Sequence, residues 1–232
     1  QNNTISGDLF FTFFSGSGFK VDNFKFEDNT VDCQNCQFAM LCVLGSTDVQ
    51  ILRNIHIERD NIRSSTTLNY FDIRQVSNQF LFENVWIDDV QITGDGSIFS
   101  LQSSGSVKIS NISAYNNRLT AFLKPDVEKA VISNFAAQNN SFQGDLIHIP
   151  RSCNLEISNV EFRNNNISKS IFTTQQDSNV SVSDIVSIHN SYSKGSFITL
   201  KRNSRLDVLN LQSFGDSFNE ESIFLNCVVS KI

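Results

Sequence analysis

The chain has 232 residues, a formal net charge of −6, 40% apolar residues, 21 phenylalanines and two prolines. Its basic residues are scattered, which argues against a protein that follows a nucleic-acid backbone. No segment approaches roughly 18 continuous apolar residues, so nothing in this segment is expected to span a membrane.

The first structural unit follows a polar lead-in at residues 1–8. Residues 9–29 contain an apolar strand (LFFTF), a Ser-Gly-Ser-Gly turn and a second strand in which apolar and polar residues alternate around Asn23. Alternation with period two indicates a strand with one buried face. The central asparagine indicates a sharp bend, because Asn tolerates the left-handed backbone conformation well.

The same bend recurs along the chain at intervals of 23 to 31 residues, most clearly in LEISNVEFRNN at residues 155–165. The positions one after and two before the bend are apolar in every unit, which establishes a repeat. We predict that the bend residues stack as a ladder formed by Asn23, Asn54, Asn84, Asn111, Asn134, Asn159, Asp184 and Asn210.

Each unit also contains an apolar strand upstream of the bend. Counting back 13 residues from each bend residue places the centre of this strand at Phe10, Leu41, Phe71, Ile98, Ala121, Leu146, Ile171 and Phe197. About three short strands per unit, without a helical pattern, are typical of a β-helix coil. Residues 10–226 resemble the right-handed, pectin-lyase-like β-helix family, in which an asparagine ladder lies at a tight turn. We therefore predict an all-β, right-handed, single-stranded parallel β-helix of about nine coils.

A second polar pair follows each bend strand, for example at residues 116–117, 139–140 and 164–165. We interpret this pair as the end of the third strand and the start of a variable loop. The loop is longest at residues 30–40 and 61–70 and shrinks to 118–120. Because solenoid insertions often carry binding determinants, the long loops of the first three coils are one candidate functional face, and tolerated insertions are the alternative.

Residues 1–232 are expected to form one β-helix segment excised from a longer solenoid. Residues 223–225 open another coil, Ile232 falls where the next bend strand would begin, and neither end carries a polar cap. The next ladder asparagine is expected at about position 236.

Five cysteines are present, and we expect a disulfide among Cys33, Cys36 and Cys42, which lie in or near the longest loop. A redox pair or half of a zinc site are the alternatives. Glycosylation sequons begin at Asn2, Asn111, Asn139, Asn166 and Asn179, and Asn111 is set aside as a crowded ladder position. Together these features favour an extracellular or cell-surface protein of the secretory pathway.

We identify no catalytic constellation. The segment from Asn84 to Asp89, NVWIDD, is similar to the WIDH motif of pectate lyases, with Asp89 in place of the histidine. Asp88, Asp89 and Asp95 could bind calcium, or form a solvated acidic loop. His148 is expected on an exposed polar column with Ser100, Thr173 and Thr199, and no carboxylate partner is evident for His56 or His189. No cofactor and no metal are expected.

The favoured hypothesis is a non-catalytic structural or interaction segment of a large surface protein, such as a stalk, filament subunit or adhesive scaffold. Its partners would be flanking β-helix coils, copies of itself or other surface proteins, with glycans as a further class of partner and nucleic acid excluded. The alternatives are a carbohydrate-binding β-helix module and a polysaccharide lyase or hydrolase that uses Asp88 and Asp89.

Overall fold

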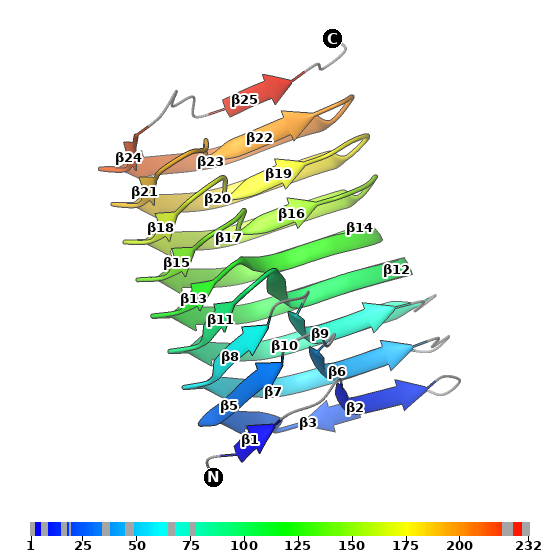
Figure 1. Ribbon diagram of the computed structural model, residues 1–232. Coiled ribbons are helices and arrows are strands. Elements are labelled where there is room, and N and C mark those ends of the chain that lie inside the picture. The colour runs from blue at the N-terminus through cyan, green and yellow to red at the C-terminus, as the bar shows by residue number, and fades with distance from the viewer. Residues whose placement is uncertain are drawn as a thin grey trace.

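The computed structural model is an all-β parallel solenoid in which successive turns stack into a rod (Figure 1). It describes residues 3–5, 9–14, 18, 20–33, 38–44, 49–64, 68–74, 78–219 and 225–228. Every strand pair is parallel, and no helix occurs among the described residues. The predicted fold class, a parallel β-solenoid without helices, is confirmed.

Each turn contains three segments in chain order, which we call the front, bend and short strands. The front strands are β2 (Leu9–Phe14), β6 (Phe38–Leu44), β9 (Leu68–Arg74), the first parts of β12 (Gly96–Tyr115) and β14 (Ala121–Gln138), β16 (Ile147–Ile149), β19 (Phe172–Thr174), β22 (Ile198–Lys201) and β25 (Leu225–Val228). The bend strands are β3 (Lys20–Asp22) with β4 (Lys25–Glu27), β7 (Gln50–Glu58), β10 (Gln79–Asp88), the second parts of β12 and β14, β17 (Asn154–Arg163), β20 (Asn179–Ile188) and β23 (Arg205–Phe214).

The short strands form a separate nine-stranded sheet. They are β1 (Asn3–Ile5), β5 (Asn29–Cys33), β8 (Asn61–Ser64), β11 (Gln91–Thr93), β13 (Arg118–Leu119), β15 (Ser141–Phe142), β18 (Asn166–Ile167), β21 (Ser191–Tyr192) and β24 (Ser217–Phe218). Because β1 and β25 each belong to incomplete turns, the described residues complete slightly fewer turns than the predicted number of about nine.

The predicted bend is confirmed at all eight positions, where φ lies between 53° and 58°. The side chains stack as predicted over most of the rod: the Nδ2 groups of Asn84, Asn111, Asn134 and Asn159 each donate to the Oδ1 atom one turn earlier, at 2.7–3.0 Å. Two steps differ. Asn54 donates to Asp22 rather than Asn23, and Asp184, which has no amide hydrogen, accepts from Asn210 at 2.9 Å. This outer ladder is exposed to solvent.

A second, buried ladder lies at the next corner and was not predicted. Its members are Asn29, Asp60, Asn117, Asn140, Asn165, Asn190 and, half-buried, Asp216, while Val90 occupies this position in one turn. The residue before each member has a left-handed backbone, with φ between 51° and 65°. The left-handed residue and the ladder residue after it form the second polar pair of most units. Our interpretation of this pair as the start of a variable loop was wrong, because the pair forms a corner that is followed by the short strand.

Asn140 illustrates how the buried ladder satisfies backbone and side-chain groups together. Its Oδ1 accepts from the backbone N–H and from Nδ2 of Asn117, both at 2.9 Å. Its Nδ2 donates to the Ala114 carbonyl and to Oδ1 of Asn165, again at 2.9 Å. One buried amide therefore links neighbouring turns in both directions along the rod.

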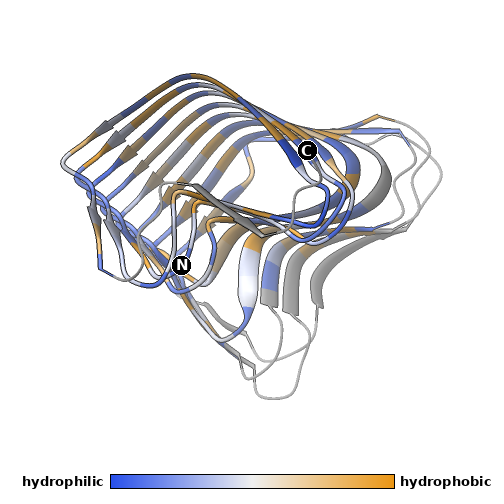
Figure 2. Cartoon of the chain, turned by 90° about the horizontal axis from the view of Figure 1, so that it is seen from above, coloured by the Kyte–Doolittle hydropathy of each residue, from blue (hydrophilic) through white to orange (hydrophobic). Residues whose placement is uncertain are grey.

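Apolar columns fill the interior between the three sets of strands. Figure 2, which looks down on the turns, shows hydrophobic and hydrophilic residues stacked in register. Phenylalanine rings follow one another along the axis, with centroid distances of 4.7–6.4 Å between Phe99, Phe122, Phe135, Phe162 and Phe172. This continuous contact explains the high phenylalanine content.

The two predicted bend-strand columns are confirmed, but the predicted front-strand column is not. Phe71 faces Phe99, not Ile98, and Phe99 faces Leu123, not Ala121. The constant offset failed because the connection from the front strand to the bend varies in length. Residues at the predicted positions, such as Ile98, are nevertheless buried.

The buried ladder predicts a large difference between two otherwise similar substitutions. Asn140→Ala leaves the Asn117 donors and the Asn165 acceptor without their partner, so we expect a loss of about 2–4 kcal/mol in the free energy of unfolding. Asn134→Ala at the exposed bend should cost only about 1 kcal/mol, mainly for a left-handed alanine. Urea unfolding of both variants measures the difference, and equal losses would contradict a dominant buried ladder.

Asp60 predicts a dependence of stability on pH. Its carboxylate accepts hydrogen bonds from the Asn29 backbone at 2.7 Å and from the Tyr70 hydroxyl at 3.0 Å. Burial outweighs these bonds and raises the pKa of Asp60 above its ordinary value of 3.8. Folding therefore favours the protonated carboxyl group, and this contribution to stability is full below pH 3.8 and is lost as the pH rises through the raised pKa.

Asp60→Asn should therefore be more stable than the parent at pH 7, with a difference that shrinks toward pH 3.8. Urea unfolding across this range tests the sign. Asp216→Asn, in the same column but half-buried, is the matched control and should show a smaller change. A less stable Asp60→Asn protein at pH 7 would show that the ladder needs the charge.

Candidate functional site

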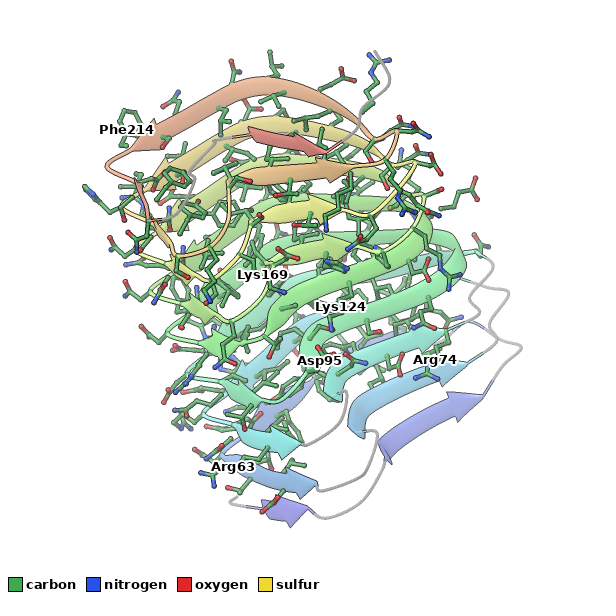
Figure 3. All side chains as sticks on the ribbon, turned by 45° about the horizontal axis from the view of Figure 1, so that its top comes forward. Arg63, Arg74, Asp95, Lys124, Lys169 and Phe214 are labelled. Atoms are coloured by element: carbon green, nitrogen blue, oxygen red, sulfur yellow. The ribbon has the colours of Figure 1, made fainter. Side chains whose placement is uncertain are left out.

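A polar cleft of about 490 Å³ lies over front strands β16, β19 and β22. Its lining includes Asp145, His148, Thr199 and three lysines: Lys169, Lys194 and Lys201. We call it the lysine cleft. Lys169 and Lys194 come from the turns that precede β19 and β22, and Lys201 ends β22. Figure 3 shows Lys169 on the same face of the rod as Lys124.

His148 is not an isolated surface histidine. Its Nδ1 lies 3.1 Å from Oδ2 of Asp145, and its Nε2 lies 3.5 Å from Nε2 of Gln175. Burial opposes ionisation of Asp145, but hydrogen bonds from His148, the Ser170 backbone and Thr173 overcome it and hold the pKa of Asp145 below its usual value. The carboxylate, which can only accept, therefore orients the His148 ring through Nδ1.

Hydroxyl groups form the floor of the lysine cleft. Oγ1 of Thr199 lies 2.9 Å from Oγ of both Ser170 and Ser196, and Ser196 donates to the Ile198 carbonyl at 3.0 Å. The predicted register of His148 with Thr173 and Thr199 is confirmed. The predicted exposure is wrong for Ser100 and Thr173, which are buried.

A second, shallower groove of about 390 Å³ runs along the outer ladder beside Trp86. Its lining includes Lys25 and the amides of Asn23, Asn54 and Asn84, and we call it the tryptophan groove. Trp86 is 39% exposed, with its ring stacked on His56 at 6.2 Å and tilted against Tyr115 at 5.0 Å. The NVWIDD segment thus carries a partly exposed aromatic side chain that borders this groove.

The acidic residues of that segment are not brought together. Asp88 accepts a hydrogen bond from Asn116 at 3.0 Å, Asp89 forms a left-handed corner, and Asp95 pairs with Lys124 at 3.1 Å. Figure 3 shows Asp95 beside Lys124. Among the described residues, no group of three or more His, Cys, Asp or Glu side chains could hold a metal ion. The candidate calcium site at Asp88, Asp89 and Asp95 does not assemble there.

The expectation that His56 lacks a carboxylate partner is also wrong. Nε2 of His56 lies 3.0 Å from Oε2 of Glu58, two residues further along the same strand. Outward side chains two residues apart on one strand lie on the same face, so this spacing could have identified the pair.

The predicted disulfide lies outside the described residues: Cys36 and the side chains of Cys33 and Cys42 are not described. Cys153 is a free, buried cysteine whose thiol pKa is raised to about 12 by burial. Asn2 also lies outside the described residues. Asn139, Asn166 and Asn179 are exposed, although Nδ2 of Asn179 donates to Asn154 at 3.0 Å.

The sequence contained a signal for the lysine cleft that we did not use. Lys169 and Lys194 occupy equivalent turns in successive units, within Ser-Lys-Ser and Ser-Lys-Gly-Ser segments. A cation repeated at one position of a solenoid stacks on one face. The candidate face was instead assigned to the long loops of the first three coils.

Comparisons with protein-family models, with curated proteins and with solved structures found no match. Among the described residues, no helix has the length and apolar character needed to cross a membrane.

Proposed function

We propose that this chain is a non-catalytic structural and interaction scaffold in which further parallel solenoid turns stack on the rod. The observation that carries this proposal is the edge of β23. Among the described strands, β23 pairs only with β20, so no described strand bonds to the backbone groups along its other edge.

The inward columns of β23 support the same interpretation. Val182, one turn earlier, is 1% exposed, whereas its partner Val208 in β23 is 44% exposed. Leu206 and Leu211 are only partly buried against the core. At the other end of the rod, Val21 and Phe24 are likewise partly buried. Among the described bend strands, the first and the last therefore have apolar columns that are covered less completely than those between them.

The occupant that fits the β23 edge is a parallel strand with apolar residues at the two inward columns and an amide at the bend. Its amide would donate to Asn210, continuing the outer ladder. A second copy stacked head to tail would supply such a turn from its first coil, and repetition of this contact would build a filament.

The stacking proposal predicts concentration-dependent association of the purified chain. Val208→Lys, which places a charge in an inward column, should abolish it. Gln212→Lys, on the exposed outward side of the same strand, is the matched control and should leave it intact. Analytical ultracentrifugation measures both, and a chain that stays monomeric at all concentrations, or equal effects of the two variants, would refute stacking between copies.

We also propose an extracellular or cell-surface location and membership of the pectin-lyase-like β-helix family. The repeat pattern and the parallel solenoid support the family assignment. The exposed sequon asparagines Asn139 and Asn166 support the location, because exposed sequons can accept glycans in the secretory pathway. Mass spectrometry of the secreted chain, before and after glycosidase treatment, tests the location through glycan occupancy.

A second candidate function, carbohydrate binding, is favoured by the tryptophan groove. Trp86 offers an aromatic side chain that is 39% exposed, and the adjacent ladder amides supply hydrogen-bond donors and acceptors. Aromatic platforms flanked by a few polar groups suit the apolar faces and hydroxyls of a sugar.

Carbohydrate binding predicts that Trp86→Ala loses at least about tenfold in affinity for a neutral oligosaccharide, equivalent to about 1.4 kcal/mol. A glycan array followed by calorimetry on the best ligand measures this loss. Phe214→Ala removes another exposed aromatic side chain, 54% exposed, and should leave binding unchanged. Absence of any array ligand, or an equal loss in both variants, would count against the groove.

A further inference from the structure

We infer that the lysine cleft binds a small hydroxylated ligand that carries a tetrahedral oxyanion, a phosphate or sulfate ester. This inference is independent of the scaffold proposal, because it concerns the outward face of the front strands rather than the stacking edge.

The first argument is charge. Three lysines line the cleft against one aspartate, in a chain whose net charge is −6. Among the described residues, no ammonium group of Lys169, Lys194 or Lys201 lies within the 4.0 Å that defines an ion pair with a carboxylate. Lys124, on the same face, is paired with Asp95 at 3.1 Å (Figure 3). Within the part of the chain that the structure describes, the three ammonium groups of the cleft therefore form no ion pair.

The second argument is the geometry of the cations. Lys169 and Lys194 come from equivalent turns and Lys201 from the end of β22, and all three line the same cleft. Lysine acts as a point charge with three donors, which suits the several oxygens of a tetrahedral anion. A planar carboxylate is matched better by the fork of an arginine, and no arginine lines the cleft.

The third argument is the floor of the cleft. Ser196 donates its hydroxyl hydrogen to the Ile198 carbonyl, so Thr199 must be the donor to Ser196. Ser170 is then the donor to Thr199, and the hydroxyl hydrogens of all three residues are used. The remaining oxygen lone pairs of these hydroxyls and the amide of Gln175, which lies beside His148, can bond to hydroxyl groups of a ligand. The volume of about 490 Å³ lies in the range of small-molecule sites.

Asp145 does not cancel this preference. Its carboxylate is engaged by His148 at 3.1 Å and by the Ser170 backbone at 3.1 Å, and its single negative charge faces three lysine charges in the lining. The aspartate orients the histidine, and the lysines remain available to the anion.

The test is a titration of the whole chain by heteronuclear NMR with glucose 6-phosphate, glucose 6-sulfate and glucose. At about 0.01 M ionic strength, where screening is weak, saturable shifts of cleft residues are expected with at least one ester and not with glucose. A preference between the two esters identifies the anion. Absence of saturable binding of both esters, or equal binding of glucose, overturns the inference.

Variants then localise the site. Lys169→Ala/Lys194→Ala should weaken ester binding by at least about tenfold, and Lys124→Ala, the matched control, should leave it unchanged. If the double alanine variant unfolds, Lys169→Gln/Lys194→Gln retains most of each side-chain stem and serves in its place. An equal loss in Lys124→Ala would reveal general attraction to a charged face and overturn the site.

Discussion

The structure depends on two left-handed corners in each turn. At each corner, stacked side chains bond to the turns before and after and so stabilise the strained backbone. Each turn of the rod bends twice at residues with φ near 55°, a conformation that costs most side chains about 1–2 kcal/mol. At the outer bend the left-handed residue is the ladder residue itself, and at the second corner it directly precedes the buried ladder residue. An asparagine amide both donates and accepts, so that equivalent corners of successive turns can bond to one another. Stacking makes the unfavourable conformation cooperative: a corner is stabilised by the corners before and after it.

The two ladders have different energetic roles because they lie in different environments. At the outer bend, water competes with each amide bond, and substitutions such as Asp184 are accommodated. At the inner corner, Asn140 and Asn165 are buried, and a missing partner would leave a desolvated donor or acceptor. The inner ladder therefore fixes the register of neighbouring turns more strongly. Val90 shows one tolerated interruption, where the backbone N–H still donates to Asn117 at 2.9 Å.

Bend strands were predictable because every unit keeps the same spacing around its asparagine. The front strands were not, because register there depends on connections whose length varies, as the Phe71–Phe99 pairing shows. The short strands escaped detection although their inward column is wholly apolar, since two-residue strands such as β13 carry almost no periodic signal. Of the candidate sites, Trp86 was visible in the sequence, whereas the lysine cleft arises from three separate segments and becomes evident only when turns are stacked.

The same stacking explains why the lysine cleft lies away from the two ladders. Each amide of the buried ladder is committed to neighbouring turns, whereas an exposed amide of the outer ladder, such as Asn84, gives only part of its hydrogen-bonding capacity to its neighbours. The front strands are free of this requirement, and the turns before them differ between units. In the later turns these connections are short enough to hold Lys169 and Lys194 directly over the sheet. Because successive turns stack, Lys194 lies one turn after Lys169 on the same face, and the repeat concentrates positive charge there.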